Sequence, residues 1–214
     1  MSTFIPARLA ALHHSTPVGA FVELEQPATY TTQRWSDVVE GAGFAISGER
    51  LWTLADHVRP GMRMLICGLN PSPASADGQV AFAKPGNRFW PAMLGAGLAD
   101  RDRNPAALLR DQRIGMTDIV KRTTRRASEL DPSEYVAGLA RLNRLARWLQ
   151  PASLCFIGLA GWRTAVDKRA KPGWQDPLVG GRPAYVMPST SGLNARSQLA
   201  DLTEHLRNAA ETLC

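Results

Sequence analysis

The sequence predicts an α/β fold in which a mostly parallel central sheet is covered by helices on both faces. Three apolar segments have the composition of buried strands, over residues 62–69, 153–159 and 184–187, and helical patterns separate them. Strands that alternate with helices are typical of parallel sheets, because a parallel connection needs a crossover segment. Each strand ends in a loop rich in Gly, Pro or Ser. These loops would meet at the carboxyl edge of the sheet, where ligands bind in open α/β folds.

The first 60 residues give mixed signals and are predicted to form an extension of unclear role. Residues 18–24 read as a strand and residues 49–57 as a short helix. Pro60-Gly61 then breaks the chain before the first buried strand.

The helices that follow are predicted from caps and spacing. Residues 87–98 form one helix, with Asn87 as its cap, and a second helix follows Pro105 before an apolar stretch at 114–120. Asp131-Pro132-Ser133-Glu134 is a capping box that opens a longer helix, which Pro151 ends. A last amphipathic helix carries leucines at positions 199, 202, 206 and 213.

Arginines 141, 144 and 147 fall on a face of the longer predicted helix that the leucines do not use. Charged residues in such a pattern usually form a solvated surface. We therefore expect these three side chains to be exposed.

Composition places the chain among soluble globular proteins. It has 214 residues, 44% of them hydrophobic and 21% charged. No apolar run approaches the ~20 residues of a membrane span. The first 20 residues contain Pro6, Arg8, His13 and His14 where a signal peptide would need an apolar segment, so a cytoplasmic location is expected.

Cysteine and histidine usage gives no metal, disulfide or cofactor site. Cys67 and Cys155 lie in strand-like runs and read as small buried hydrophobes, and Cys214 stands near the end of the chain. No Cys-x-x-Cys spacing exists, and the four histidines are not spaced as ligands near a strand end. We expect no metal and no cofactor.

Charge divides unevenly along the chain. Residues 1–60 carry four Arg/Lys against six Asp/Glu, a net of −2, whereas residues 61–214 carry 21 against 13, a net of +8. A basic surface on the larger part is what binding to a phosphate backbone needs.

The loop after the first strand contains Gly68-Leu69-Asn70-Pro71, which delivers a polar amide to the carboxyl edge. No Gly-Lys-Ser/Thr follows, so it is not a Walker phosphate loop, and the Gly-x-Gly-x-x-Gly of dinucleotide sites is absent. The Gly-x-Ser-x-Gly of α/β-hydrolases is absent too.

Three linked motifs resemble the mismatch-specific uracil/thymine DNA glycosylases of the uracil-DNA glycosylase superfamily. The first runs from Gly68 to Trp90 and includes Ala83-Lys84-Pro85-Gly86-Asn87-Arg88-Phe89-Trp90. The second is 115–124 and the third 185–193. They span roughly residues 62–206 in the family's order. The resemblance implies the three-layer fold of that superfamily, with a catalytic domain over 61–214.

The family's chemistry can be carried over position by position. Such an enzyme flips a damaged or mispaired base into a pocket. Asn70 matches the catalytic residue that positions the attacking water, and Phe82 the aromatic on which the base stacks. The other positions matched to the base pocket are Gly68, Leu69, Ser75 and Asn87.

The resemblance also implies the DNA contacts. The wedge that enters the duplex corresponds to Gly192, Leu193 and Asn194, and Arg196 contacts the opposite strand. Residues that match phosphate contacts are Lys84, Lys121, Arg122, Thr124, Ser189, Thr190 and Ser191. The expected partner is double-stranded DNA containing a mispaired or damaged base, bound by a monomer without any membrane. No lysine occupies the motif that carries the attack, so lyase activity is not expected.

Two departures from the family leave alternatives open. Asp118 stands where the thymine-specific branch carries Asn, and a carboxylate there either orients the water as a second catalytic group or repels an anionic base. Met187 replaces the Asn or His that opens the closing motif in other branches, which leaves the range of lesions open. The alternatives are a glycosylase for another lesion such as hypoxanthine, a DNA-lesion-binding module without turnover, and a hydrolase of small nucleotides.

Overall fold

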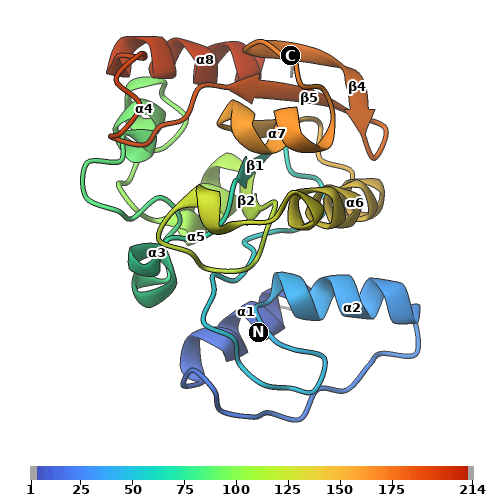
Figure 1. The fold of residues 1–214 in the computed structure, drawn as a ribbon. Coiled ribbons are helices and arrows are strands. Elements are labelled where there is room, and N and C mark those ends of the chain that lie inside the picture. Colours follow the sequence, from blue (N-terminus) through green and yellow to red (C-terminus); the bar gives the residue numbers. More distant parts are fainter. Residues whose placement is uncertain (1–3, 212–214) are drawn as a thin grey trace.

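A computed structural model, which describes residues 4–211, contains one five-stranded sheet of order β2-β1-β3-β5-β4 (Figure 1). Strands β2, β1, β3 and β5 are parallel, and β4 pairs antiparallel with β5. The strands are β1 (Met64–Gly68), β2 (Ile114–Asp118), β3 (Leu154–Ile157), β4 (Gly173–Val179) and β5 (Arg182–Met187). The predicted mostly parallel α/β fold is therefore confirmed.

Helices cover both faces of this sheet. Side chains alternate along each strand, so each strand packs against helices on both sides. Met64 and Ile66 pack on one face against α4 (Phe89–Gly95), α5 (Pro105–Gln112) and α8 (Leu199–Glu211). Leu65 and Cys67 pack on the other against α6 (Pro132–Leu149) and α7 (Leu159–Ala165). The four strand residues are fully buried, which explains why β1 reads as a continuous apolar run.

Of the predicted caps, the one that opens α6 is confirmed. The Asp131 side chain accepts from the backbone N–H of Ser133, and Glu134 reaches back to the Asp131 N–H, which completes the capping box of α6. The helix predicted over 87–98 is shorter, because α4 spans Phe89–Gly95 and its N-cap is Arg88 instead of Asn87. Asn87 Oδ1 still accepts from the Phe89 N–H, at 2.9 Å, from the position before the cap. A short helix, α3 (Pro73–Gly78), follows β1 directly.

The prediction for residues 1–60 is wrong in its elements. The segment contains two helices, α1 (Ile5–Ser15) and α2 (Thr32–Gly41), which enclose a small core of their own around Trp35 and Phe44. Residues 18–24 form only an isolated bridge, from Phe21 to Glu49. Residues 49–57 are extended rather than helical. Glu49 and Arg50 form bridges with other parts of the first segment, and His57 forms a bridge with Met116 of β2.

Strand β4 has no counterpart in the sequence prediction. It carries Asp176-Pro177 in its middle and is largely exposed. Proline is confined to edge strands and bulges, and this edge strand is irregular between Gln175 and Val179. Its sequence therefore lacks the pattern of a central strand.

The predicted exposure of the α6 arginines is wrong for Arg141, which is 1% exposed. Its guanidinium binds the Asp56 carboxylate at 2.9 Å. Arg144 is half-buried and forms a two-pronged pair with Asp37 of α2, at 2.7 and 2.8 Å. Arg147 is exposed as expected. Burial of an arginine is compatible with folding only when its charge is compensated, and residues 37 and 56 of the first segment supply that charge.

Candidate functional site

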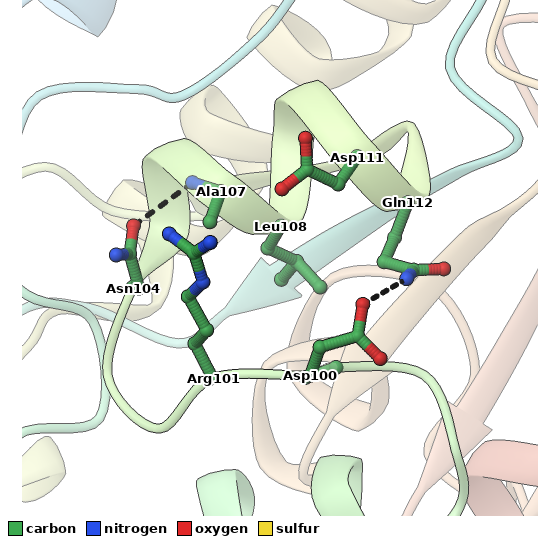
Figure 2. Close-up of a pocket in the computed structure, with 8 residues that line it drawn as sticks. Asp100, Arg101, Asn104, Ala107, Leu108, Asp111 and Gln112 are labelled. Carbon is green, nitrogen blue, oxygen red and sulfur yellow. Dashed lines mark hydrogen bonds between the residues drawn. The ribbon is translucent and has the colours of Figure 1, made fainter.

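A cavity of about 980 Å³ opens at the carboxyl edge of the sheet. Loops that follow β1, β2, β3 and β5 all contribute to its walls. It brings together Asn70, Phe82, Asp118 and Leu193, which lie far apart in the sequence. A second hollow beside α5 (Figure 2), between Asp100 and the helix, holds only about 10 Å³, which is room for one water and not for a base.

The Asn70 side chain is fixed in one orientation. Its Nδ2 donates to the Thr124 hydroxyl at 2.8 Å and to the Arg122 carbonyl at 2.9 Å. The Thr124 hydroxyl donates to the Arg126 carbonyl at 2.9 Å, so it can only accept from Asn70. Both partners therefore require the amide nitrogen. The Oδ1 atom makes no hydrogen bond to the described part of the chain and is available at the cavity wall.

Asp118 closes β2 and lines the same cavity, with 6% of its surface exposed. Its carboxyl makes no hydrogen bond or ion pair within residues 4–211. Gly68 on the neighbouring strand leaves room for it, because a Cβ there would collide with Asp118 Oδ1. Burial raises the pKa of Asp118 to about 6; Asp56 acts in the same direction, while Lys121 and Arg141 oppose it. The group therefore changes charge close to neutral pH.

Phe82 provides an aromatic wall. Its ring stacks on Phe89 with centroids 4.1 Å apart and an interplanar angle of 22°. The backbone at Phe82 is left-handed, with φ of 58°, and both flanking residues are tied down. The Ala81 carbonyl accepts from the Trp90 indole, and the N–H of residue 83 donates to the Ser75 hydroxyl. Ser75 thus acts in part by holding the Phe82 loop. Leu69, Ser75 and Asn87 also line the cavity. Gly68 does not line it but lies against Asp118 and Phe82.

The predicted wedge is an exposed tip on a braced loop. Leu193 is 86% exposed. Gly192 lies against the Gly86 carbonyl, where a Cβ would come within 2.9 Å of the oxygen. The Asn194 amide donates to the Ser189 carbonyl at 2.8 Å, so it stabilises the loop.

Arg88 is the main brace of this loop, and sequence reasoning gave it no role. Its guanidinium donates to the carbonyls of Ser191 at 2.9 Å and Asn194 at 2.7 Å, and also to that of Ser197. Its backbone N–H donates to the Thr190 carbonyl at 2.9 Å. The side chain therefore joins the first motif to the third.

The predicted phosphate contacts need correction. Lys121 is buried and its ammonium binds Asp56 at 2.8 Å, so the prediction that it contacts DNA is wrong. Arg122 is exposed, but Glu134 occupies its guanidinium through two bonds of 2.8 and 2.7 Å. Thr124 and Thr190 are buried, at 6% and 1% exposure. The Thr124 hydroxyl is used by Asn70, and the Thr190 carbonyl accepts from the Arg88 N–H.

Other residues that are predicted to contact DNA lie at the cavity wall or on the surface. Lys84, Ser189 and Ser191 line the cavity, and the backbone N–H of Arg196 is held by Asn194 while its side chain is exposed. Arg125 and Arg126 also line the rim. Both are exposed, and neither guanidinium forms a hydrogen bond or ion pair with the chain between residues 4 and 211. The signal in the sequence that could have identified these two arginines as DNA contacts is their position in the basic run Thr123-Thr124-Arg125-Arg126.

Leu54, from the first 60 residues, also lines the cavity, which the sequence could not indicate without the fold. Over the described range, no group of three or more His, Cys, Asp or Glu side chains is arranged to hold a metal ion. Residues 4–211 also contain no helix with the length and apolar character to cross a membrane.

Comparison with known proteins agrees with this architecture. The solution NMR structure of a Methanosarcina acetivorans protein described as a "putative Uracil DNA glycosylase" matches with a TM-score of 0.50 and 23% sequence identity. The match covers 74% of this chain and 96% of that one, and at this identity it shows a shared fold. A family model described as the uracil DNA glycosylase superfamily matches residues 55–214. The chain therefore belongs to the uracil DNA glycosylase superfamily.

Proposed function

We propose that this protein is a monofunctional DNA glycosylase that removes uracil from mismatches with guanine by hydrolysing the N-glycosidic bond. The observation that carries the proposal is the fixed Asn70 amide, whose nitrogen is held by Thr124 and the Arg122 carbonyl. That arrangement leaves Oδ1 to accept a hydrogen bond from a water in the cavity.

The proposed reaction depends on a good leaving group. An amide is too weak a base to take a proton from water early in the reaction, so Asn70 orients the water while the base departs as an anion. Phe82 stacks against the extruded base and places its glycosidic bond beside that water. Uracil departs more easily than thymine, whose methyl group donates electrons, so uracil is the preferred substrate and thymine a slower one.

Asp118 is the proposed second catalytic group. Its ionised carboxylate stabilises the positive charge that develops on the sugar as the bond to the base breaks. The same carboxylate accepts a hydrogen bond from the attacking water. Since the pKa of Asp118 lies at about 6, this contribution is present above that pH and is lost as the pH falls through it.

DNA binding is proposed to use the rim of the cavity. Leu193 enters the duplex and fills the space of the flipped nucleotide. Arg125, Arg126 and Lys84 contact phosphates, with Ser189 and Ser191 as hydroxyl and amide donors. These groups surround the cavity mouth, so one monomer can hold the duplex on both sides of the extruded base.

A wider range of lesions is the second candidate. A carboxylate in the base pocket can accept from an N–H group of a base, and Met187 offers no donor to the leaving base. Duplexes carrying uracil, thymine, hypoxanthine or ethenocytosine opposite guanine, and uracil opposite adenine, test both candidates under single-turnover conditions with alkaline cleavage of the abasic product. We expect uracil opposite guanine to react fastest. Binding without product from every duplex would overturn the enzymatic proposal, and cleavage of free nucleosides would favour a small-molecule hydrolase.

A further inference from the structure

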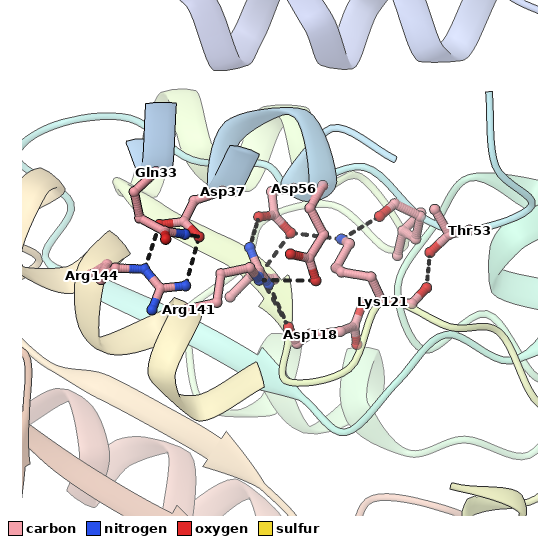
Figure 3. A network of polar contacts seen from close by, with 11 residues as sticks. Gln33, Asp37, Thr53, Asp56, Asp118, Lys121, Arg141 and Arg144 are labelled. Atoms are coloured by element: carbon pink, nitrogen blue, oxygen red, sulfur yellow. Dashed lines mark hydrogen bonds and ion pairs between the residues drawn. The ribbon is translucent and has the colours of Figure 1, made fainter. Parts of the chain in front are cut away.

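A buried charge network lies next to Asp118 of the candidate site (Figure 3). At its centre the Asp56 carboxylate, with 5% side-chain exposure, binds the Lys121 ammonium at 2.8 Å and the Arg141 guanidinium at 2.9 Å. It also accepts from the Thr117 hydroxyl at 2.7 Å. Burial alone would raise the pKa of Asp56. The two cations and the Thr117 hydroxyl outweigh burial, so the pKa of Asp56 is lowered. Asp56 is therefore ionised.

The network is built from four separate parts of the chain. Asp56 comes from the segment before β1, Thr117 from β2, Lys121 from the loop after it and Arg141 from α6. The same segment fixes the lysine at a second point, because Lys121 Nζ also donates to the Leu54 carbonyl. Both cations are thus anchored by residues 54–56.

Both cations lie close to Asp118 without pairing with its carboxyl. Arg141 Nη2 donates to the Asp118 backbone carbonyl at 2.8 Å and to the Thr117 hydroxyl at 3.1 Å. Lys121 is three residues further along the loop. Asp118 forms no ion pair in the described chain, whereas both cations pair with Asp56.

The other titratable groups around this network are few. A carboxylate oxygen of Glu40 in α2 lies 3.9 Å from Arg141 Nε. Cys67 of β1 is buried and the pKa of its thiol is raised by burial, so it is uncharged. His57 stands next to Asp56 in sequence, and burial is the main cause that lowers its pKa to about 4, so it is neutral as well. Lys121, Arg141 and Asp56 therefore determine the local charge at Asp118.

We propose that Asp56 is a positioning residue for catalysis: by binding Lys121 and Arg141 it keeps both cations from the Asp118 carboxyl and so sets the protonation state of that group in the base pocket. The inference rests on the proposed role of Asp118 in the glycosylase reaction. It also makes the segment that carries Asp56 part of the active site rather than a separable extension.

The test is a set of single-turnover pH profiles of uracil excision. The excision rate of the wild type should fall as the pH drops through about 6, and we call this part of the pH profile its acidic limb. Asp118→Asn should abolish the limb. Asp56→Asn leaves two buried cations beside Asp118 and should move the limb to lower pH by about one to three units. Lys121→Met removes one cation and should move it to higher pH. The double variant Asp56→Asn/Lys121→Met loses one negative and one positive charge, so it keeps the net local charge of the wild type. It should return the limb toward its wild-type position.

Asp37→Asn is the matched control, because the buried Asp37 carboxylate also pairs with an α6 arginine, but with Arg144 and not with a cation next to Asp118. It should lower stability without moving the limb. If Asp56→Asn does not fold, Lys121→Met alone decides, because its Asp56–Arg141 pair remains intact. A limb that stays at the same pH in the folded variants, or moves in the same direction in both, would overturn the inference.

A readout without turnover separates this inference from the proposed function. Titration of the Asp118 carboxyl carbon by ¹³C NMR follows its charge directly in wild type, Asp56→Asn and Lys121→Met. Opposite shifts in the two variants support the role of Asp56 even if no duplex is cleaved. Excision that is normal while the carboxyl titrates identically in all three proteins would reject the inference and leave the glycosylase assignment standing.

Discussion

Thr124→Val should slow excision without weakening DNA binding. The variant keeps the shape of the side chain but removes the hydroxyl that accepts from Asn70 Nδ2 at 2.8 Å. One neutral hydrogen bond is worth about 1 kcal/mol net, and the bond from Asn70 to the Arg122 carbonyl remains. A loss of 1 to 1.4 kcal/mol corresponds to a rate about 5- to 10-fold lower. The amide can then rotate, and Oδ1 no longer holds the water in one place.

The assay is single-turnover excision of uracil opposite guanine at saturating enzyme, with the dissociation constant measured separately. Thr123→Val is the matched control, because the neighbouring hydroxyl is buried and has no hydrogen-bond partner among residues 4–211. It should leave the rate unchanged, and Thr124→Ser should restore most of the activity. An unchanged rate in Thr124→Val, or an equal loss in both valine variants, would refute the proposed orientation of Asn70.

Three further predictions concern the walls and rim of the cavity. Replacing Arg125 and Arg126 by Gln should weaken binding to all duplexes alike and reduce the slope of log K against log salt by about one per residue; Arg101→Gln, beside α5, should not. Gly68→Ala should reduce excision at least 10-fold with little change in binding, because its Cβ displaces the carboxyl that lines the cavity; normal rates would contradict the tight fit. Arg88→Met removes three bonds to loop carbonyls, so it should raise the dissociation constant for mismatched duplex and increase proteolysis at the loop.

Strands β1, β3 and β5 and the edge of the sheet that carries the site could be predicted because their signals are local. A continuous apolar run such as β1, followed by Gly-Leu-Asn-Pro, fixes both a buried strand and the position of Asn70 at its end. The capping box of α6 is equally local. These features do not depend on what the rest of the chain does.

The roles of the charged residues could not be predicted, because they depend on distant partners. Arg141 has the spacing of a solvated face, yet Asp56, 85 residues away in the chain, compensates its charge inside the protein. Lys121 lies in a basic run that is typical of phosphate binding, but its ammonium is buried and pairs with the same Asp56 carboxylate. Edge strand β4 could not be predicted, because it contains a proline and is largely exposed, so its sequence lacks the apolar pattern of a strand. The proline is tolerated because the pairing is irregular at that point.

The proposed role of Asn70 in positioning the water is tested most directly by uracil excision with Asn70→Ala, measured in single turnover on a duplex with uracil opposite guanine. We expect the wild type to form abasic product, whereas the variant binds the same duplex with a similar dissociation constant and forms almost none. Asn70→Ala that excises uracil at the wild-type rate would contradict this role.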